Sequence, residues 1–426
     1  MGFRSLSFQR CLQTFVASSF NSKDKTYRYF SSNPAFALQQ PRKASYNEHE
    51  NGEMEWEKLG FGPVSTDFMY SMKCCEDGNF VQGNLTRYGN IEFSPFAAVL
   101  NYGQGIIEGL KVNRKDDGRL LLFRPDQHAL RMKMGAQRMC MPSPSIHQFI
   151  HAVKQTALAN IRWNNSEWPY SQTTPRSSLK RGLRTKNAVR DGATYAPPST
   201  PLNVPPPGKG SLYIRPLLIG SGPVLGVGPA PEFMFLTYAS PVGNYFKQGK
   251  TPLSLYVEEE EVRAFSGGVG GVKSVSNYGP VLKALVRAKR LGFSDVLYVD
   301  SVNKKYLEEV SASNIFTLKG NVISTPPTSG TILPGITRKS IIEIALGLGF
   351  QVEERSISVH ELTEADEVFC TGTAVGVAAV GSVTYRGTRF EFKVGETTVC
   401  QALGSTLVGI QTGLTEDKKE WIINIH

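Results

Sequence analysis

The stretch Ser266–Pro280 reads SGGVGGVKSVSNYGP and places one lysine, Lys273, among glycines and small apolar residues, with Tyr278 five positions later. Such surroundings hydrate an ammonium group poorly, so we expect Lys273 to lose its proton easily. A neutral lysine amine can attack a carbonyl and form a Schiff base, which is how enzymes hold pyridoxal phosphate.

Two other interpretations of this stretch compete with a reactive lysine. A phosphate-binding P-loop requires glycine directly before the lysine, and Val272 stands there instead, which excludes that loop. The second alternative is a glycine-rich turn with an incidental surface lysine. The stretch alone does not distinguish this turn from a reactive lysine.

Length and charge limit the possible classes of protein. A chain of 426 residues is too long for one ordinary core and predicts two domains of mixed type. The net charge of +10 comes from residues 1–46, with seven basic and one acidic residue, and from 164–203, with six basic and two acidic residues. The rest of the chain holds 34 basic and 34 acidic residues. It therefore has no surplus of basic residues with which to bind nucleic acid.

The N-terminal residues have the composition of an organellar transit peptide, rich in Ser, Phe and Arg with no acid before Asp24. The stretch Arg28–Ser32 resembles a mitochondrial processing site, so we predict a mitochondrial protein, with the chloroplast as the alternative. No apolar run reaches the roughly 18 residues that span a bilayer, which predicts no membrane segment. Six scattered cysteines without a CxxC pair predict reduced thiols and no metal site.

Helix and strand signals alternate along the chain. Ser145 caps a predicted helix that ends near residue 162. Pro280 suits the first turn of a helix that runs to Gly292. The predicted inward face of this helix carries Leu282, Leu285 and Val286. The other predicted elements are strands at 212–219, 233–239, 295–299, 314–318 and 322–325, a helix that opens at Thr337, and a hairpin turn at Arg386–Gly387.

These signals predict an N-terminal transit and disordered part at 1–46, a small α/β domain at 47–246, a linker at 247–251 and a large cofactor-binding domain at 252–426. The segment 164–203 departs from the pattern because it is polar, rich in proline and serine, and without periodicity. About forty structureless residues inside a compact domain are uncommon.

A lysine that holds pyridoxal phosphate needs a carboxylate at the pyridine nitrogen and a cradle for the phosphate. Glu308 and Glu309 precede the apolar strand at 314–318, although a solvated acidic pair would fit the spacing as well. The turn Gly330–Arg338 enters a helix start that favours an anion, with a simple capped helix as the alternative. The turn Cys370–Ala374 ends a strand with hydroxyl groups and could complete the cradle.

In this order, these features resemble the branched-chain amino acid aminotransferases of the fold-type IV pyridoxal-phosphate class, especially the plant members. The resemblance runs from Phe61 to the C-terminus, apart from 164–203. It implies an α/β fold with a small N-terminal α/β domain and a larger C-terminal α/β pseudo-barrel domain. It is carried by FGPVSTDFM (61–69), LNYGQGIIEGLKV (100–112), LFRPDQHALRMKMGAQRMCMP (122–142), GSLYIRPLL (210–218), SPVGNYF (240–246), GGVKSVSNYGPVLKA (270–284), YLEEVSASNIF (306–316), GTILPGITRKS (330–340) and EVFCTGTA (367–374).

The resemblance also implies roles for individual residues. Lys273 would bind the cofactor and then move the proton at the substrate α-carbon. Glu309 would pair with the pyridine nitrogen, and Tyr278 would hydrogen-bond the ring oxygen. The phosphate would be held by Arg131, Ile336, Thr337 and Thr373. The substrate would be surrounded by Phe61, Tyr102, Tyr213, Arg215, Tyr245, Thr373 and Ala374. The family works as a homodimer, and Leu225 and Val227 would reach into the substrate pocket of the second subunit.

The implied reaction exchanges amino groups between L-leucine, L-isoleucine or L-valine and 2-oxoglutarate, and the implied partners are these small molecules. The alternatives are another fold-type IV activity, on methionine-derived 2-oxo acids or D-amino acids, and a binding or scaffold protein impaired by the segment 164–203. The pair of Tyr213 and Arg215 favours the L-specific branched-chain subgroup.

Three departures from the family pattern stand out. Ile107 replaces an aromatic residue of many members, and Val375 and Ala378 stand where animal members carry a CxxC redox pair. In relatives the helix that ends at a residue like Trp163 continues into VPPPGKGSLY, found here at 204–213. We interpret 164–203 as translated intron sequence or a gene-model error, with a tolerated surface loop as the alternative.

Overall fold

The computed structural model describes residues 55–74, 78–161, 204–243, 245 and 251–425, which belong to one compact unit that spans Glu53–His426. The predicted transit part at 1–46 and the segment 164–203 lie outside the described residues, as does most of the predicted linker at 247–251. Within the described part of the chain, no helix is long and apolar enough to cross a membrane.

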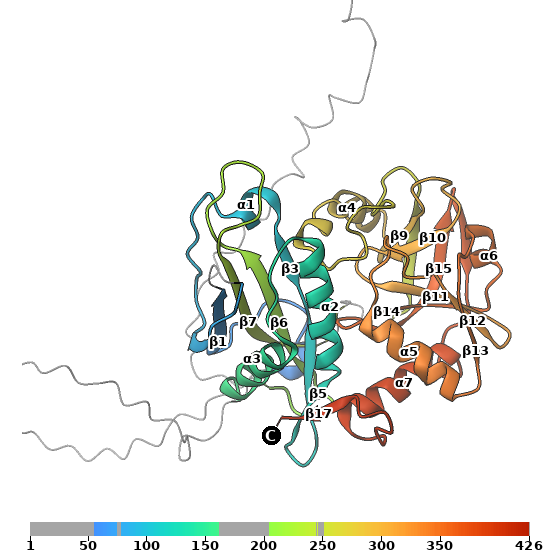
Figure 1. Cartoon of the computed structure of the whole chain (residues 1–426). Helices are drawn as coiled ribbons and strands as arrows, with labels where there is room; N and C mark the ends of the chain where they lie inside the picture. Colours follow the sequence, from blue (N-terminus) through green and yellow to red (C-terminus); the bar gives the residue numbers. More distant parts are fainter. Residues whose placement is uncertain (1–54, 75–77, 162–203, 244, 246–250, 426) are drawn as a thin grey trace, which may run out of the picture. The chain divides into compact units, whose positions relative to one another are not determined.

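An antiparallel sheet of eight strands holds most of the N-terminal half (Figure 1). Its strands follow the order β17, β5, β4, β6, β7, β1, β2, and β3 pairs with β6. Strand β17 comes from the end of the chain and pairs with β5, so the predicted large domain contributes a strand to the sheet of the predicted small domain. The strands are β1 Phe68–Cys74, β2 Asn84–Arg87, β3 Gly105–Ile107, β4 Leu110–Arg114, β5 Leu120–Phe123, β6 Ser211–Gly220, β7 Phe233–Val242 and β17 Ile422–Asn424.

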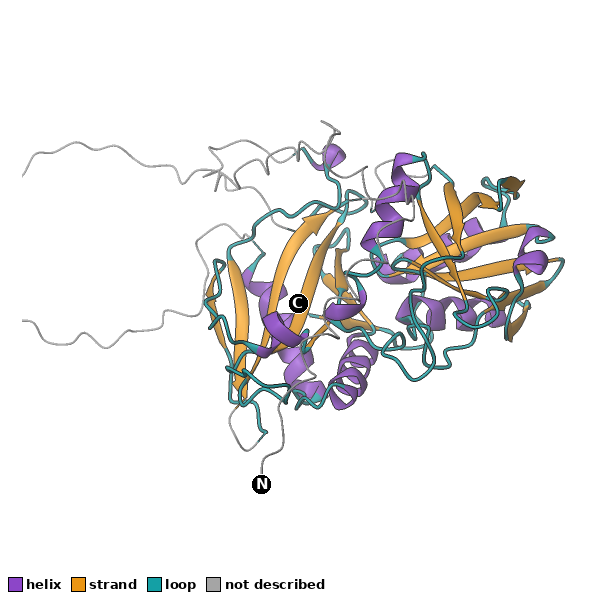
Figure 2. Cartoon of the chain, turned by 90° about the horizontal axis from the view of Figure 1, so that it is seen from above, coloured by secondary structure: helices purple, strands orange, loops and turns teal. Residues whose placement is uncertain are grey.

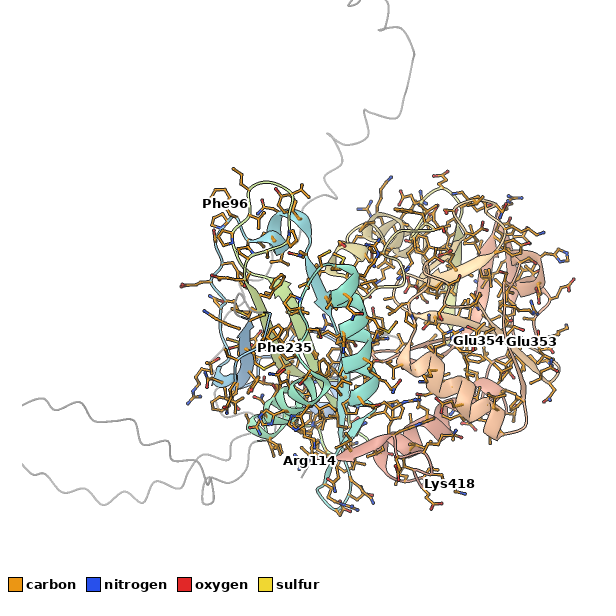
Figure 3. All side chains as sticks on the ribbon, in the orientation of Figure 1. Phe96, Arg114, Phe235, Glu353, Glu354 and Lys418 are labelled. Atoms are coloured by element: carbon orange, nitrogen blue, oxygen red, sulfur yellow. The ribbon has the colours of Figure 1, made fainter. Side chains whose placement is uncertain are left out.

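Helix α3 (Ile146–Ala159) packs against strands β1, β6 and β7 of this sheet (Figure 1). Its predicted cap is confirmed, because the Ser145 hydroxyl accepts from the Gln148 backbone N–H and the Gln148 side chain accepts from the Ser145 N–H. Phe149 packs against Phe235 of β7 with ring centroids 5.8 Å apart, and both rings are buried. Figure 3 labels Phe235 within this sheet. The first half also contains helices α1 (Ala98–Tyr102) and α2 (Pro125–Arg138).

Nine strands form a second, mixed sheet in the order β10, β9, β8, β15, β14, β11, β12, β13, with β16 paired to β15. The pairs β8–β9, β8–β15 and β12–β13 are parallel. The three predicted strands after residue 290 are confirmed as β9, β11 and β12, and the predicted turn at Arg386–Gly387 joins β15 to β16. The strands are β8 Leu253–Glu258, β9 Asp295–Val299, β10 Leu307–Val310, β11 Asn314–Lys319, β12 Val322–Thr325, β13 Gln351–Glu354, β14 Glu367–Gly372, β15 Gly376–Tyr385 and β16 Thr388–Glu391.

Helices α5 (Ile336–Gly347) and α7 (Val399–Thr412) pack against each other and against β14. Under them the rings of Phe316 and Phe369 stack with centroids 5.0 Å apart. The remaining helices are α4 (Leu282–Arg290), which packs against β9, and α6 (Val359–Thr363). Figure 2 shows helices lying along both sheets, as burial of their apolar faces requires.

The prediction for the inward face of α4 is wrong. Leu282 and Val286 are about half exposed, whereas Ala284 and Ala288 are buried. The face of α4 that packs against β9 carries Val281, Ala284 and Ala288 at helical spacing, so Leu282 and Val286 point outward.

Candidate active site

Lys273 lies in the loop between β8 and α4, where the two sheets meet. Its backbone carbonyl accepts a hydrogen bond from the Ile107 N–H at 2.9 Å, and Ser274 forms a β-bridge with Ile106 of β3. The Lys273 amine donates to the Tyr278 hydroxyl at 3.0 Å. The structure therefore brings together the lysine and the tyrosine of the opening sequence stretch.

The glycines before Lys273 allow close approach to another backbone segment. A Cβ on Gly270 would collide with the Thr331 carbonyl oxygen. The Gly271 N–H donates to the Gly330 carbonyl at 2.7 Å. Lys273 is also partly buried. The stretch is therefore a loop that packs against another backbone segment, and not a turn with a freely exposed lysine.

Glu309 of β10 is buried, with 2% of its surface exposed, so the alternative of a solvated acidic residue is wrong. Arg263 forms an ion pair with it at 2.8 Å, and the Leu333 N–H donates to the same carboxylate oxygen at 2.8 Å. Burial raises the pKa of Glu309, while the positive charges of Arg263 and Lys273 oppose that rise. Glu309 and Lys273 thus act on each other electrostatically.

Arg131 of α2 belongs to a buried ion-pair network. Its Nε and Nη2 donate to the two carboxylate oxygens of Glu108, each at 2.7 Å, and His128 Nδ1 lies 2.7 Å from Glu108 Oε2. Burial would raise the pKa of Glu108, but Arg131 and His128 outweigh it and hold that pKa well below its usual range. The remaining Nη1 of Arg131 donates to the Pro334 carbonyl at 3.1 Å.

The turn after Pro334 leads into α5, whose first N–H groups have no acceptor within the helix. Ile336 and Thr337 are the first two residues of this helix. Gly335 precedes them, and a Cβ there would collide with the side-chain oxygen of Asn314. The resulting helix start offers backbone donors and the positive end of a helix dipole to an anion.

A small cavity lies beside the start of α5. Lys111 of β4 reaches it from the first sheet, and the Lys111 amine donates to the Ala374 carbonyl at 3.0 Å. Burial lowers the pKa of Lys111 to about 8. The cavity is lined by Lys111, Phe123, His128, Ile336, Thr337, Thr373 and Gln411. Three of the four predicted phosphate residues therefore surround one space, and Arg131 adjoins it through His128.

Residues predicted at the substrate side meet in an aromatic cluster. The ring centroid of Phe61 lies 5.1 Å from that of Tyr213 and 5.0 Å from that of Tyr245. Arg215 donates to the Tyr213 hydroxyl at 3.3 Å. Burial would lower the pKa of Arg215, but nearby phenols, Tyr213 first and Tyr278 among them, raise it overall. The Tyr278 phenol of the lysine loop thus acts electrostatically on Arg215 of this cluster.

Three predicted residues lie apart from this cluster. The Tyr102 hydroxyl donates to the Leu225 carbonyl in the loop between β6 and β7. In the same loop the side chains of Leu225 and Val227 are 80% and 91% exposed. The structure does not bring these two side chains to the Lys273 of their own chain.

The sequence did not point to four ionisable residues of the candidate site: Glu108, Lys111, His128 and Arg263. His128 and Arg131 are three residues apart in a helical pattern, which places them on one face and could have indicated that they act together. Arg263 carries no local signal, because its partner Glu309 lies on a strand far along the chain.

The model of the family described as Amino-transferase class IV matches residues 200–383. The branched-chain-amino-acid aminotransferase 2, chloroplastic, of Arabidopsis thaliana is 56% identical over 407 residues, which cover 94% of each chain. The branched-chain amino acid aminotransferase 1, mitochondrial, of Humulus lupulus is 54% identical over 99% of each chain. Among solved structures, the branched-chain amino acid aminotransferase from Escherichia coli has the same fold, with a TM-score of 0.63 at 24% identity over 85% of this chain and 100% of that chain.

Proposed function

The chain belongs to the branched-chain aminotransferases of the class IV family, and on that basis we propose which of its residues carry out the reaction. The enzyme catalyses the reversible, pyridoxal-phosphate-dependent transamination of L-leucine, L-isoleucine and L-valine with 2-oxoglutarate, which yields branched-chain 2-oxo acids and L-glutamate. The observation that carries our assignment is the loop of Lys273, whose amine donates to the Tyr278 hydroxyl at 3.0 Å, together with the buried Glu309 carboxylate, which Arg263 and the Leu333 N–H hold in place.

The residues around this loop fit the cofactor. A partly buried amine is available for covalent attachment, and a buried carboxylate can keep a pyridine nitrogen protonated. A helix start with neighbouring threonine hydroxyls suits a phosphate. When bound, the cofactor supplies an electron-accepting ring for the change of bonds at the substrate α-carbon. We assign attachment to Lys273, the ring nitrogen to Glu309, the ring oxygen to Tyr278, and the phosphate to Arg131, Ile336, Thr337 and Thr373.

Two features prepare these side chains for their roles. The Tyr278 hydroxyl accepts from the Lys273 amine at 3.0 Å, so the amine stays near the reacting carbon when it moves the proton. Arg263 and the Leu333 N–H hold the Glu309 carboxylate in one orientation, which removes the entropy cost of ordering it during catalysis.

The aromatic cluster suits the two kinds of substrate. Phe61 and Tyr245 offer apolar ring surface to a branched side chain, while Arg215 offers a guanidinium to the second carboxylate of glutamate. We propose that Tyr213 and the Thr373–Ala374 turn complete this pocket, and that Tyr102, which holds the loop of Leu225, contributes to the pocket of a second subunit. One slot can then accept both substrates, because its charged group lies at the edge of an apolar surface.

We propose that the enzyme works as a homodimer. Leu225 and Val227 are large apolar side chains that a monomer would leave in water, and the Tyr102 hydroxyl holds their loop. A second subunit would cover them. Sedimentation equilibrium should give twice the chain mass for the wild type, and a Leu225→Asp/Val227→Asp variant should shift toward the monomer. A monomeric wild type would reject the dimer.

The protein is directed to an organelle, since close relatives are named as chloroplastic and mitochondrial proteins. We propose the mitochondrion, because Arg28–Ser32 resembles a mitochondrial processing site. A C-terminal fluorescent fusion in plant cells distinguishes the two organelles, and fluorescence in plastids would contradict the proposal.

Replacement of the lysine tests the assignment. The purified wild type should show a cofactor absorbance band near about 410 nm that sodium borohydride abolishes, and Lys273→Ala should lack both the band and transamination. Lys289→Ala, which changes an exposed lysine on α4, is the matched control and should keep both. A borohydride-sensitive band in Lys273→Ala would overturn the assignment. The assay should be run with and without residues 164–203, because an inactive full chain and an active shortened one would indicate that this segment impairs the enzyme.

A further inference from the structure

Two cationic side chains, Arg131 and Lys111, lie at or next to the cavity beside the start of α5. The charge of Arg131 is already balanced by a carboxylate of the protein. Arg131 donates twice to Glu108, which is fully buried. Burial lowers the pKa of His128, so this neighbour contributes little charge at neutral pH. The charges of Arg131 and Glu108 therefore cancel, and this pair offers hydrogen bonds to the cavity without a net positive charge.

Lys111 differs from Arg131 because no carboxylate of the described residues forms an ion pair with it. Its one hydrogen bond at this site goes to the neutral carbonyl of Ala374 at 3.0 Å. No carboxylate within the described ranges acts on its pKa, which burial alone lowers to about 8. An ammonium carries three donors, so two of them remain for another acceptor in the cavity that Lys111 lines.

A phosphate group at the start of α5 brings a charge of about −1.5 to −2 at neutral pH. The helix start supplies only about half a positive charge, and the hydroxyls of Thr337 and Thr373 supply none. A charge that is removed from water and left unbalanced is costly. A full cation would balance this charge, and among the described residues that line the cavity Lys111 is the one that carries it.

We propose that Lys111 is a further cofactor-binding residue, whose ammonium balances the charge of the cofactor phosphate at the start of α5, beside the small cavity of about 10 Å³ that Lys111 lines with Thr337 and Thr373. This inference rests on the proposed function, because it concerns the cofactor of that reaction. Arg131 then contributes directed hydrogen bonds, and Glu108 holds its guanidinium in place. The bond from Lys111 to Ala374 also links the phosphate side of the site to the proposed substrate turn.

Binding of two cofactor forms to the apo-dimer separates this role from a structural one. Pyridoxal phosphate and pyridoxal are each titrated, by absorbance, into the wild type, Lys111→Met, Lys111→Arg and the control Lys73→Met, which changes an exposed lysine on β1 of the same sheet. Loss of a charged hydrogen bond should weaken the binding of pyridoxal phosphate to Lys111→Met by about 10- to 100-fold. Binding of pyridoxal, which lacks the phosphate, should not change.

Lys111→Arg should retain most of the affinity, and Lys73→Met should match the wild type. A ³¹P spectrum adds a second measurement. The bound phosphate should stay dianionic in the wild type as the pH falls toward its second pKa of about 6, whereas in Lys111→Met it should begin to titrate.

Two results would overturn the proposal. An unchanged affinity of Lys111→Met for pyridoxal phosphate would exclude Lys111 as the charge partner. An equal loss for both cofactor forms would show that Lys111 only holds the turn at Ala374. Failure of the proposed function is distinct from both, since the wild type itself would then form no borohydride-sensitive cofactor band.

Discussion

Replacement of Gly109 by alanine should damage the substrate side of the site without touching the lysine loop. Gly109 lies between β3 and β4, and the ring of Tyr213 fills the space beside it. A Cβ on Gly109 would overlap the Tyr213 hydroxyl and lie only 2.6 Å from its Cζ, whereas real Cβ contacts almost never fall below 3.0 Å. The phenol must therefore move.

The packing around Tyr213 sets the size of the effect. The residue is 9% exposed, contacts the ring of Phe61 and accepts a hydrogen bond from Arg215, so it cannot move freely. Overpacking of this kind costs about 1–3 kcal/mol of stability. A displacement of about 1 Å at a substrate-positioning group reduces the rate by about 100-fold. We therefore expect kcat/KM for L-leucine with 2-oxoglutarate to fall about 100-fold in Gly109→Ala.

The assay compares steady-state kinetics, the cofactor band and thermal unfolding. Gly89→Ala is the control, because no atom lies within 4 Å of a Cβ at that position. Tyr213→Phe removes the clashing oxygen, so Gly109→Ala should do less further damage in that background, and the double-mutant cycle should be non-additive by about 1 kcal/mol. Wild-type kinetics in Gly109→Ala, or strict additivity with Tyr213→Phe, would refute the reasoning.

Three further outcomes are expected. Arg263→Met leaves the buried Glu309 without its ion-pair partner, so thermal unfolding should report a loss of about 3–5 kcal/mol, and an unchanged Tm would contradict this. Ser145→Ala removes the cap of α3 and should lower the urea midpoint by an amount equivalent to about 1 kcal/mol at constant m-value, whereas no shift would show that the cap adds no stability. The pKa of Lys111 falls from 10.5 to about 8 on folding, so below pH 8 its charge destabilises the apo-fold by up to roughly 3 kcal/mol, and this cost disappears as the pH rises to 10.5. Unfolding of apo-wild type and apo-Lys111→Met should therefore converge over that window, and a constant difference between them would count against the buried charge.

Local patterns in the sequence were sufficient for several parts of the fold. Ser145 and Gln148 are three residues apart, and their reciprocal hydrogen bonds depend only on the backbone between them. The turn at Arg386–Gly387 likewise follows from two adjacent residues, both with positive φ, which suit a tight hairpin. Helix α4 was predicted with the wrong inward face because hydrophobicity alone assigns Leu282 and Val286 to the core, whereas packing against β9 buries the small Ala284 and Ala288.

The candidate site was predictable only in part. Lys273 and Tyr278 could be paired from the sequence, since five residues of one loop separate them. Glu309 could be nominated as a carboxylate, but its burial and its ion pair with Arg263 depend on how separate segments of the second half pack. The strand β17 at the chain end, paired with β5, gave no signal either.

The sequence by itself determined the chemistry that this protein has available: a lysine in a glycine-rich loop, a carboxylate before a strand and a helix start for an anion. Tertiary structure decided the charge of the proposed phosphate site. Arg131 and Lys111 are both cations in the sequence, yet Glu108 neutralises only Arg131. Lys111 donates to Ala374 in the turn between β14 and β15 and forms no ion pair with a carboxylate of the described residues. Such a difference depends on distances through space, because Coulomb energy and desolvation follow the folded neighbours of a charge and not its neighbours along the chain.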